Sequence, residues 1–245
     1  MEKRLFTVTA NTLAARDTYR MRLEAVEPGF VFSGEFVDIA IDGFYLRRPI
    51  SVCDCGPGWI ELYYKVVGEG TKVLSVAKPG STLELLTGLG HGFDPSATGR
   101  AALLAAGGLG AAPLYLLARE LKAQGKKVSV VLGFNKADEI VLLDEFRALC
   151  DEVEVATMDG SVGVKGFVTD AIAKMDPEYD YFYTCGPMVM MKAVCGVLKG
   201  GGEASLEERM GCGAGFCYGC SCKTLVGTRR ICKDGPVFKK EDIIW

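Results

Sequence analysis

Histidine is nearly absent from this sequence: His91 is the only one among 245 residues, and we expect it to be an ordinary loop residue. Basic clusters are absent too, because the 28 lysines and arginines are scattered and balanced by 31 acidic residues, for a formal charge of -3. Proteins that bind nucleic acid usually carry a basic patch or stripe. The composition therefore predicts a soluble globular protein with no nucleic-acid partner.

A hydrophobic segment suited to crossing a membrane is also lacking. Residues 101–118 carry no charge, but Gly107, Gly108, Gly110 and Pro113 divide them into a strand, a turn and a helix. The N-terminus, MEKRLFTVTANTL, lacks the apolar core of a signal peptide. We therefore expect a cytoplasmic protein in a reducing compartment, where cysteines serve as metal ligands, buried thiols or redox groups more often than as disulfides.

Cysteine, by contrast, is abundant: there are ten, and half of them lie in the last 34 residues of the chain. Cys212, Cys217 and Cys220 have the C-x4-C-x2-C spacing of plant-type 2Fe-2S proteins, and Cys232 is the candidate fourth ligand. The additional Cys222 is predicted to be a free thiol, because the x4 and x2 spacings are already filled. This pattern predicts an iron–sulfur site, and the alternative is a redox-silent zinc-binding interaction module.

Glycines surround these cysteines and support a tight loop. They are Gly211, Gly213, Gly215 and Gly219. Glycine adopts positive φ readily, so such a loop can wrap an inorganic cluster and direct backbone N–H groups at its sulfurs. The segment around them has too little apolar material for a core of its own, and metal ligation would supply the missing folding energy.

The remaining chain divides into two regions of different periodicity. Residues 1–97 contain short apolar or alternating runs separated by turn residues, which predict an antiparallel β-barrel. These runs are Leu5–Thr9, Tyr19–Leu23, Phe36–Ile41, Ile50–Cys53 and Ile60–Val67. Residues 98–200 alternate between strands and helices, with helices expected at about 111–124 and at 168–175, which predicts a doubly wound parallel sheet. Residues 201–245 form the cysteine-rich segment.

Two segments of the barrel region suit an anion. Arg47 and Arg48 precede Pro49-Ile50-Ser51, and a guanidinium offers a planar fork of donors to a phosphate. The segment 65–71, KVVGEGT, can present backbone N–H groups to an anion. Taken separately, the spacing of the first segment favours a solvated arginine pair before an edge proline, and the second segment is a hairpin or a helix cap. Together they are consistent with a clamp for a flavin diphosphate.

Two further segments lie where parallel sheets bind ligands. The loop 107–113, GGLGAAP, joins the first strand of the sheet to its first helix, and TCGPM at 184–188 ends the last predicted strand. The glycine loop is either a pyrophosphate site or a close packing turn. Cys185 is either at the ligand-binding edge of the sheet or a buried small apolar residue.

These motifs, taken in order along the chain, resemble a known family. RRPIS, VVGEGT, GGLGAAP and TCGPM resemble the ferredoxin reductase family of flavoproteins, over essentially the whole chain. ERMGCGAGFCYGCSC and ICKDGPVF resemble one branch of it, the electron transfer subunits of B-type (NAD-dependent) dihydroorotate dehydrogenase. The resemblance implies a Greek-key FAD-binding barrel at 1–97, an α/β NAD-binding domain at 98–200 and a 2Fe-2S module at 201–245.

The resemblance also implies roles for individual residues. The FAD site would comprise Arg48, Pro49, Ile50, Ser51, Lys65, Val66, Val67, Gly70 and Thr71. The NAD site would comprise Gly107, Gly108, Gly110, Pro113, Cys185, Gly186 and Pro187. The cluster ligands would be Cys212, Cys217, Cys220 and Cys232. Lys65 stands where the family often has arginine, and the loop GGLGAAP lacks the usual valine or isoleucine.

The implied function is electron transfer without an acid–base catalytic residue. Electrons would pass from the FMN of a dihydroorotate-oxidising catalytic subunit through 2Fe-2S and FAD to NAD, as part of pyrimidine biosynthesis in a heterotetramer of two subunits of each kind. NAD is favoured over NADP because no arginine cluster follows Gly133-Phe134-Asn135, although Lys136 is nearby. The alternative within the same flavoprotein branch is a subunit of a bifurcating transhydrogenase or sulfhydrogenase.

Overall fold

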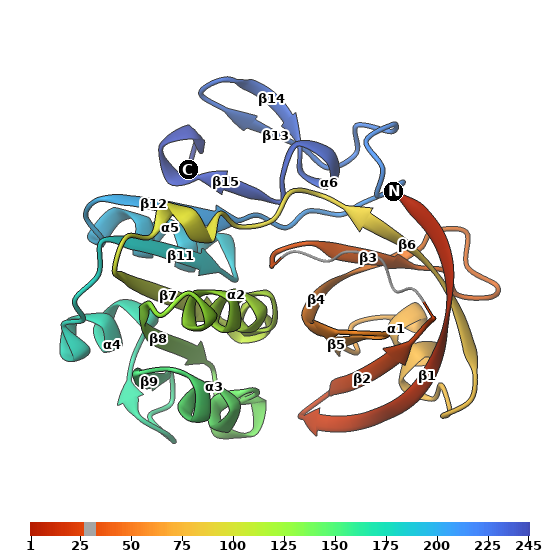
Figure 1. The fold of residues 1–245 in the computed structure, drawn as a ribbon, viewed down its shortest axis with the longest axis horizontal. Helices are drawn as coiled ribbons and strands as arrows, with labels where there is room; N and C mark the ends of the chain where they lie inside the picture. The colour runs from red at the N-terminus through yellow and green to blue at the C-terminus, as the bar shows by residue number, and fades with distance from the viewer. Residues whose placement is uncertain (27–32) are drawn as a thin grey trace.

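A computed structural model describes residues 1–26 and 33–245 of the chain. A β-barrel and an α/β domain lie side by side, and the C-terminal segment packs across both of them (Figure 1). The barrel is closed and antiparallel, with the strand order β1-β2-β5-β4-β3-β6. Its strands are β1 (Glu2–Ala15), β2 (Thr18–Glu24), β3 (Phe36–Ile39), β4 (Arg48–Gly56), β5 (Trp59–Lys65) and β6 (Thr82–Leu89). Helix α1 (Glu69–Ser75) follows β5.

Alternation along β3 explains how the barrel has both a core and a binding face. Val37 and Ile39 pack in the barrel interior, whereas Phe36 packs against residues of the C-terminal segment. Successive side chains of a strand point to opposite faces, so Asp38 shares the outer face with Phe36. Opposite them on β4, Pro49 pairs with Asp38 and Ser51 pairs with Phe36. The outer face of β3 and β4 therefore carries part of the predicted flavin motif.

The second region is a seven-stranded sheet in the order β10-β9-β8-β7-β11-β12-β15. Its strands are β7 (Ala101–Gly107), β8 (Lys127–Phe134), β9 (Glu152–Thr157), β10 (Val164–Lys165), β11 (Tyr181–Cys185), β12 (Gly201–Ser205) and β15 (Val237–Lys239). All neighbouring strands are parallel except β15, which is antiparallel to β12. The chain places β8 on one side of β7 and later β11 on the other, so the carboxyl ends of β7 and β11 flank the point where ligands bind in such sheets.

Helices cover both faces of this sheet. They are α2 (Ala111–Ala123), α3 (Leu143–Leu149), α4 (Val168–Met175) and α5 (Met188–Val197). Leu104 and Val130 pack with α2 and α3 in one core, while Leu103 and Val131 pack with α4 and α5 in another. The described residues also form four short 3-10 helices: η1 (Pro95–Ala97), η2 (Gly108–Gly110), η3 (Ala137–Glu139) and η4 (Lys240–Asp242). The predicted barrel and doubly wound sheet are confirmed.

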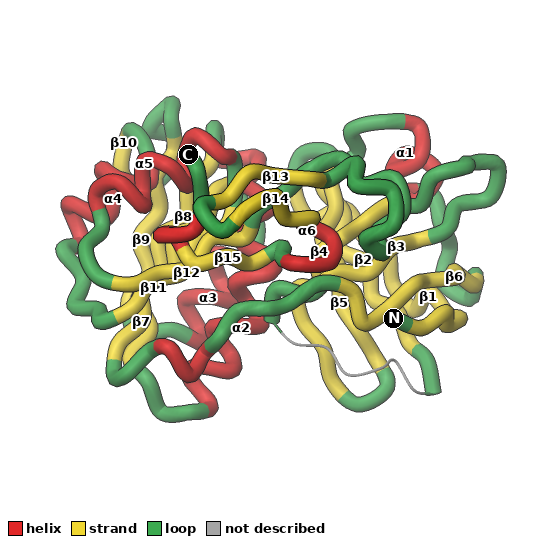
Figure 2. Tube along the Cα trace, turned by 90° about the horizontal axis from the view of Figure 1, so that it is seen from above, coloured by secondary structure: helices red, strands yellow, loops and turns green. Residues whose placement is uncertain are grey.

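The C-terminal segment contains a hairpin of β13 (Ser221–Thr224) and β14 (Gly227–Arg230), followed by α6 (Ile231–Asp234). Its apolar residues, such as Ile231 and Cys232, share one cluster with Phe36 of the barrel and Ala204 of the sheet. The view from above shows the hairpin lying over the sheet and α6 near the barrel (Figure 2). Both β12 and β15 lie after residue 200 and still belong to the sheet, so the C-terminal segment shares structure with the α/β region. The division into three domains stays a prediction.

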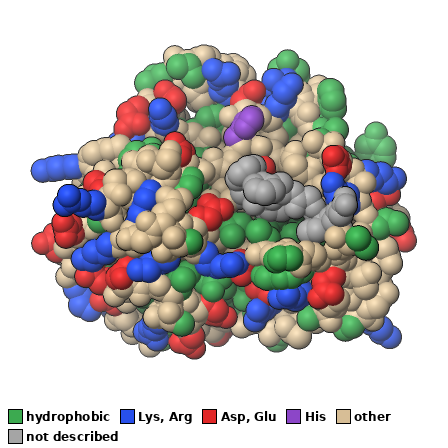
Figure 3. All heavy atoms as spheres, in the orientation of Figure 1, with side chains coloured by type: hydrophobic (Ala, Val, Ile, Leu, Met, Phe, Trp, Pro, Cys, Tyr) green, Lys and Arg blue, Asp and Glu red, His purple; other side chains and the backbone are tan. Residues whose placement is uncertain are grey.

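Two predictions from composition can be compared with the structure. No helix among the described residues is both long enough and apolar enough to cross a membrane. His91 is exposed, and its backbone N–H donates to the Gly235 carbonyl at 2.6 Å. The single histidine is visible at the molecular surface (Figure 3). It is an ordinary loop residue, as expected.

Candidate functional site

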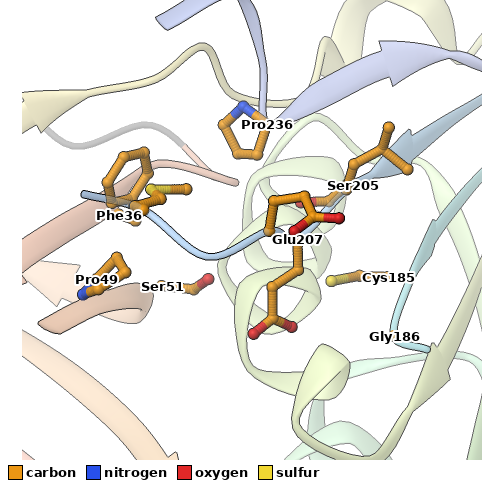
Figure 4. A pocket seen from close by; sticks show the side chains of 11 residues that line it. Phe36, Pro49, Ser51, Cys185, Gly186, Ser205, Glu207 and Pro236 are labelled. Atoms are coloured by element: carbon orange, nitrogen blue, oxygen red, sulfur yellow. The ribbon is translucent and has the colours of Figure 1, made fainter. Parts of the chain in front are cut away.

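A cavity opens where the barrel, the sheet and the C-terminal segment meet. Its lining residues are Phe36, Pro49 and Ser51 from the barrel, Cys185, Gly186 and Ser205 from the sheet region, Leu206, Glu207, Glu208 and Met210, and Pro236. We call residues 206–210 the connecting segment, because they lead from β12 to the cysteine loop. Pro49 and Ser51 lie on one side of this cavity and Cys185 on the other, with Glu207 between them (Figure 4). The structure thus brings the predicted flavin and nucleotide motifs to one place.

Arg48 and the start of α1 form the cationic end of the predicted flavin site. A Cβ added to Gly70 would stand 2.3 Å from Arg48 Nε, so only glycine allows the guanidinium to lie against this backbone. Thr71 Oγ1 accepts the N–H groups of Val67 at 3.0 Å and Gly68 at 3.2 Å. Arg48 also lies 4.9 Å from the Phe44 ring centroid. This cradle fits a diphosphate, because it joins a planar cation to a glycine-rich turn.

The neighbouring Arg47 has a different role. It pairs with the carboxylate of Glu84 and donates to the backbone carbonyl of Asp38 at 3.3 Å. These contacts hold Arg47 within the barrel, whereas the guanidinium of Arg48 donates to the backbone carbonyls of Leu46 and Arg47. Of the two arginines, Arg48 is the one available to an anion.

Lys65, also predicted for the flavin site, contacts the α/β domain. Its Nζ lies 3.6 Å from Glu139 Oε1. Glu139 also accepts a hydrogen bond from Asn135 at 2.8 Å and pairs with Arg16 of the barrel. Burial raises the pKa of Glu139, but the bonds from Asn135 and Arg16 outweigh it and bring the pKa below its ordinary value. Lys65 and Glu139 therefore join the barrel to the nucleotide domain.

The predicted nucleotide loops touch each other through their backbones. A Cβ on Gly110 would stand 2.1 Å from the Cys185 carbonyl oxygen, and one on Gly186 would stand 2.8 Å from the Gly107 nitrogen. Gly186 also has a φ of +147°. Glycine is required at these positions because β7 and β11 are neighbours in the sheet and their loops leave it together. The glycine loop is a close packing turn, and it lies at the carboxyl edge of the sheet; its role as a pyrophosphate site stays a prediction.

A second cleft continues from this edge along the carboxyl ends of the strands. Its lining includes Gly107, Gly108, Pro187, Phe134, Asn135, Glu139, Met158 and Phe167. Apolar side chains with a few polar groups are typical of a site for a small molecule or cofactor. Pro113, also predicted for the NAD site, is buried in α2. Its contribution there is to the start of the helix.

The four predicted cluster ligands form two close pairs. Cys212 Sγ accepts the N–H groups of Phe216 at 3.3 Å and Cys217 at 3.4 Å. Cys220 Sγ accepts the N–H group of Cys232 at 3.4 Å. Within the part of the chain that the structure describes, no three histidine, cysteine or acidic side chains are gathered tightly enough to hold a metal ion as they stand.

The pKa values of two of these thiols shift in opposite directions. Burial raises the pKa of Cys212, but backbone N–H donors from Ala214, Cys217 and Phe216 outweigh it and lower the pKa to about 6. Burial, followed by the neighbouring Cys220, raises the pKa of Cys232 to about 12. A thiolate is the form that binds metal, and N–H groups directed at sulfur stabilise it. The four sulfurs are the donor type that a 2Fe-2S cluster requires, and the N–H groups around Cys212 favour its thiolate, whereas Cys232 would have to release a proton on ligation.

Cys222 stays apart from these pairs. It lies on β13, partly buried against the shared apolar cluster, and burial raises the pKa of its thiol. That environment favours a neutral thiol. The assignment of Cys222 as a free thiol remains a prediction.

Sequence reasoning missed the connecting segment. Glu207 and Glu208 line the cavity, although the sequence pattern only marked them as the start of the cysteine-rich motif. The sequence signal for this position was the short run GGEASLEE. If its first five residues are taken as a strand, Glu207 and Glu208 follow the carboxyl end of that strand, where parallel sheets bind ligands.

Comparison with known proteins agrees with this arrangement. Residues 207–244 match the iron–sulfur cluster binding domain of dihydroorotate dehydrogenase B, and residues 104–196 match the oxidoreductase NAD-binding domain. The chain is 42% identical to a dihydroorotate dehydrogenase B (NAD(+)) electron transfer subunit of Fusobacterium nucleatum, covering 97% of this chain and 96% of that protein. It is 38% identical to the protein of the same name from Bacillus pumilus, covering 99% and 98%.

Solved structures show the same fold. One, described as an NADH-dependent reduced ferredoxin-NADP oxidoreductase studied for flavin-based electron bifurcation, has a TM-score of 0.88 and 31% identity over 99% of this chain and 90% of that chain. The ferredoxin reductase of carbazole 1,9a-dioxygenase has a TM-score of 0.66 at 24% identity over 78% and 63%, which supports the fold alone. Two relatives with the same name align with almost the whole chain, and the cluster-binding domain matches as well. This chain therefore belongs to the family of electron transfer subunits of dihydroorotate dehydrogenase B.

Proposed function

We propose that this chain carries electrons from the FMN of a dihydroorotate-oxidising catalytic subunit, through a 2Fe-2S cluster and FAD, to NAD in the cytoplasm. The observation that carries the proposal is the cavity that joins three motifs: Ser51 of the barrel, Cys185 at the sheet edge and the connecting segment to the cysteine loop. An electron carrier needs its redox groups close together, and this junction is the place where the three parts of the chain meet.

The residues of the chain would hold these groups as follows. Arg48, Gly70 and Thr71 hold the diphosphate of FAD, and Pro49 and Ser51 face its ring from the outer side of β4. Gly107, Gly186 and Pro187 admit the nucleotide to the edge of the sheet. Cys212, Cys217, Cys220 and Cys232 are the proposed cluster ligands. Bound FAD supplies the link between two-electron hydride transfer and one-electron transfer to an iron–sulfur centre.

The C-terminal segment also offers a surface for the catalytic subunit. Phe216 and Tyr218 flank Cys217 in the loop and are 77% and 62% exposed, while Leu225 and Val226 at the hairpin turn are 71% and 58% exposed. Exposed apolar groups that gather in one small segment are typical of a protein interface. We propose that the FMN-containing subunit docks here, beside the cluster ligands, in a heterotetramer of two subunits of each kind.

Reconstitution with the catalytic subunit tests the proposal. The two purified proteins should form a stable complex and catalyse orotate-dependent oxidation of NADH, an activity that neither has alone. The visible spectrum of this chain should show flavin and 2Fe-2S absorption. A stable complex without this activity would contradict the pyrimidine role, and a colourless protein would favour the zinc-binding alternative.

The structural similarity to a bifurcating reductase supports one other candidate function. In that case the chain would exchange electrons between nicotinamide nucleotides and ferredoxin together with a different flavoprotein partner. Supplying reduced ferredoxin and NADP in place of orotate distinguishes the two. Turnover with ferredoxin and no turnover with orotate would favour the bifurcating function.

A further inference from the structure

Arg230 lies at the end of β14, next to the loop that carries the proposed cluster ligands. Its side chain is 20% exposed, so most of it packs against other groups. Its Nη1 donates to the Gly215 carbonyl at 2.9 Å, and its guanidinium carbon lies 4.9 Å from the centre of the Tyr218 ring. Gly215 and Tyr218 stand on either side of Cys217 in the chain. One guanidinium therefore holds the cysteine loop at two points.

Asp234 of α6 fixes the direction of this guanidinium. Its carboxylate accepts the Arg230 Nε–H at 3.2 Å and the Arg230 backbone N–H at 2.8 Å. A planar guanidinium that is held along one edge presents its other N–H groups in a fixed direction, which the ammonium group of lysine does not. Arg230 thus joins the hairpin and α6 to the cysteine loop.

The two contacts in the loop lie beside proposed ligands. The N–H of Gly215, whose carbonyl Arg230 holds, is directed at the thiol of Cys232. Tyr218 directly follows Cys217 and has a φ of +58°, a conformation that residues other than glycine seldom adopt without support from their neighbours. Groups outside the ligand set orient the ligands and change metal affinity in this way. Arg230 can therefore orient two of the four proposed ligands without binding metal itself.

The positive charge of Arg230 has a second consequence. Arginine stays protonated in proteins, so this charge is constant. In the proposed function, a one-electron step oxidises the FMN of the catalytic subunit and reduces the cluster, and no covalent bond forms or breaks. The step adds one negative charge to a centre that thiolates and sulfides already make anionic. A nearby cation stabilises this added charge and so raises the reduction potential.

We propose that Arg230 is a positioning residue for the iron–sulfur cluster: it fixes the cysteine loop around the ligands, and its charge favours the reduced cluster. The inference rests on the proposed function, because it requires Cys212, Cys217, Cys220 and Cys232 to hold the cluster. Its consequence is that the cluster accepts electrons from the catalytic subunit more readily.

Opposite charge changes in the Arg230–Asp234 pair separate this role from that of a structural ion pair. Arg230→Gln removes the cation and leaves the carboxylate unpaired, whereas Asp234→Asn removes the carboxylate and leaves the cation. We would titrate each purified holoprotein with dithionite and redox mediators and follow the EPR signal of the reduced cluster. At a fixed solution potential, the ratio of reduced to oxidised cluster should fall roughly three- to fivefold in Arg230→Gln, as for a partly exposed ion pair, and should rise in Asp234→Asn.

The rate of iron release to an excess of chelator measures how firmly the loop is held. Arg230→Gln should release iron roughly tenfold faster or more, following the loss of metal affinity when a group that orients ligands is removed. Arg230→Lys keeps the charge but not the planar fork, so it should keep the wild-type ratio of reduced to oxidised cluster and still release iron faster. Arg229 is exposed and points to the opposite face of β14, so Arg229→Gln is the matched control and should leave both values near those of the wild type.

Two results would overturn the inference: a ratio that moves in the same direction in Arg230→Gln and Asp234→Asn, or wild-type values of both ratio and iron release in Arg230→Gln. If Arg230→Gln assembles no cluster, Arg230→Lys and Asp234→Asn carry the test, and a ratio that falls in either of them contradicts the inference. A wild-type holoprotein without iron would instead contradict the cluster of the proposed function, and the inference with it.

Discussion

At the scale of single residues, the lack of a side chain at Gly110 allows the two loops at the nucleotide-binding edge of the sheet to pack together. Gly110 has an ordinary helical φ of −59°, so its backbone conformation is open to any residue. What excludes a side chain is the Cys185 carbonyl, 2.1 Å from where a Cβ would stand. The loop after β7 and the loop after β11 can approach each other only because this atom is missing.

Gly110→Ala should therefore damage the nucleotide site. Relieving the contact requires the two loops to move apart, so NAD affinity should fall by at least about tenfold while FAD, held by the barrel, is retained. Calorimetric titration and the flavin absorbance report the two effects separately. A Cβ added to Gly196 in α5 would meet no described atom within 4 Å beyond its own helix, so Gly196→Ala should instead stabilise the protein by about 0.5–1 kcal/mol.

A second residue-scale prediction concerns the buried Glu203 on β12. Burial raises its pKa from 4.5 to about 7, although its carboxylate accepts the Asp94 N–H at 3.0 Å. Between pH 4.5 and 7 the unfolded chain loses this proton and the folded chain keeps it. The free energy of unfolding therefore falls as pH rises through that window, by roughly 2 kcal/mol after allowing for solvent screening.

Glu203→Gln should remove this pH dependence while keeping an oxygen for the Asp94 N–H. The variant should melt at a higher temperature than the wild type at pH 8 and at nearly the same temperature at pH 4.5. Thermal unfolding of the holoprotein at both pH values measures the difference. A wild-type-like change in melting temperature between the two pH values would contradict the assignment.

At the scale of elements, the cysteine loop depends on its neighbours. Its apolar residues complete a cluster that also contains side chains from β3, β6 and β12, and β15 extends the sheet. The loop itself carries exposed aromatic groups and thiol pairs rather than a core. Metal ligation and packing against two larger units therefore replace the apolar core that so short a segment cannot form.

Cys217→Ser should remove the cluster and leave FAD in place. Cys217 is exposed in the loop, and the predicted flavin residues lie on β4, on β5, on α1 and in the loop between β5 and α1. Iron content and visible absorption should fall, while the flavin released on denaturation stays at the wild-type amount. Cys222→Ser is the control and should keep the iron; equal iron in both variants would show that Cys217 is not a ligand.

At the scale of the whole molecule, the C-terminal segment lies across the barrel and the sheet (Figure 1). Leu225 and Val226, at the turn of its hairpin, are exposed to solvent. Leu225→Asp should weaken association with the catalytic subunit at least about tenfold, because it places a charge in the proposed interface. Leu13 on β1 is 65% exposed and far from this segment in the chain, so Leu13→Asp is the matched control. Sedimentation with the partner measures both; equal association of Leu225→Asp would refute the docking surface.

Much of the element pattern was predictable from local sequence. Helix α4 begins and ends at the predicted residues, Val168 and Met175, and α2 begins at the predicted Ala111. Apolar spacing and terminal glycine or proline act over a few residues, so they are readable without the fold. Strands β12 and β15 were not predicted, because short strands in glycine-rich sequence carry little periodicity and become strands only by pairing with a sheet already present.

The sequence by itself determined the local chemistry: the C-x4-C-x2-C spacing, the arginine beside Ser51 and the glycines of two loops, because each depends on residues adjacent in the chain. Only the tertiary structure decided that Glu207 shares a cavity with Ser51 and Cys185, and that Lys65 reaches Glu139. The shared cavity and the ion pair each bring together residues from separate elements. They follow from the packing of barrel, sheet and C-terminal segment as a whole, which no short stretch of sequence encodes.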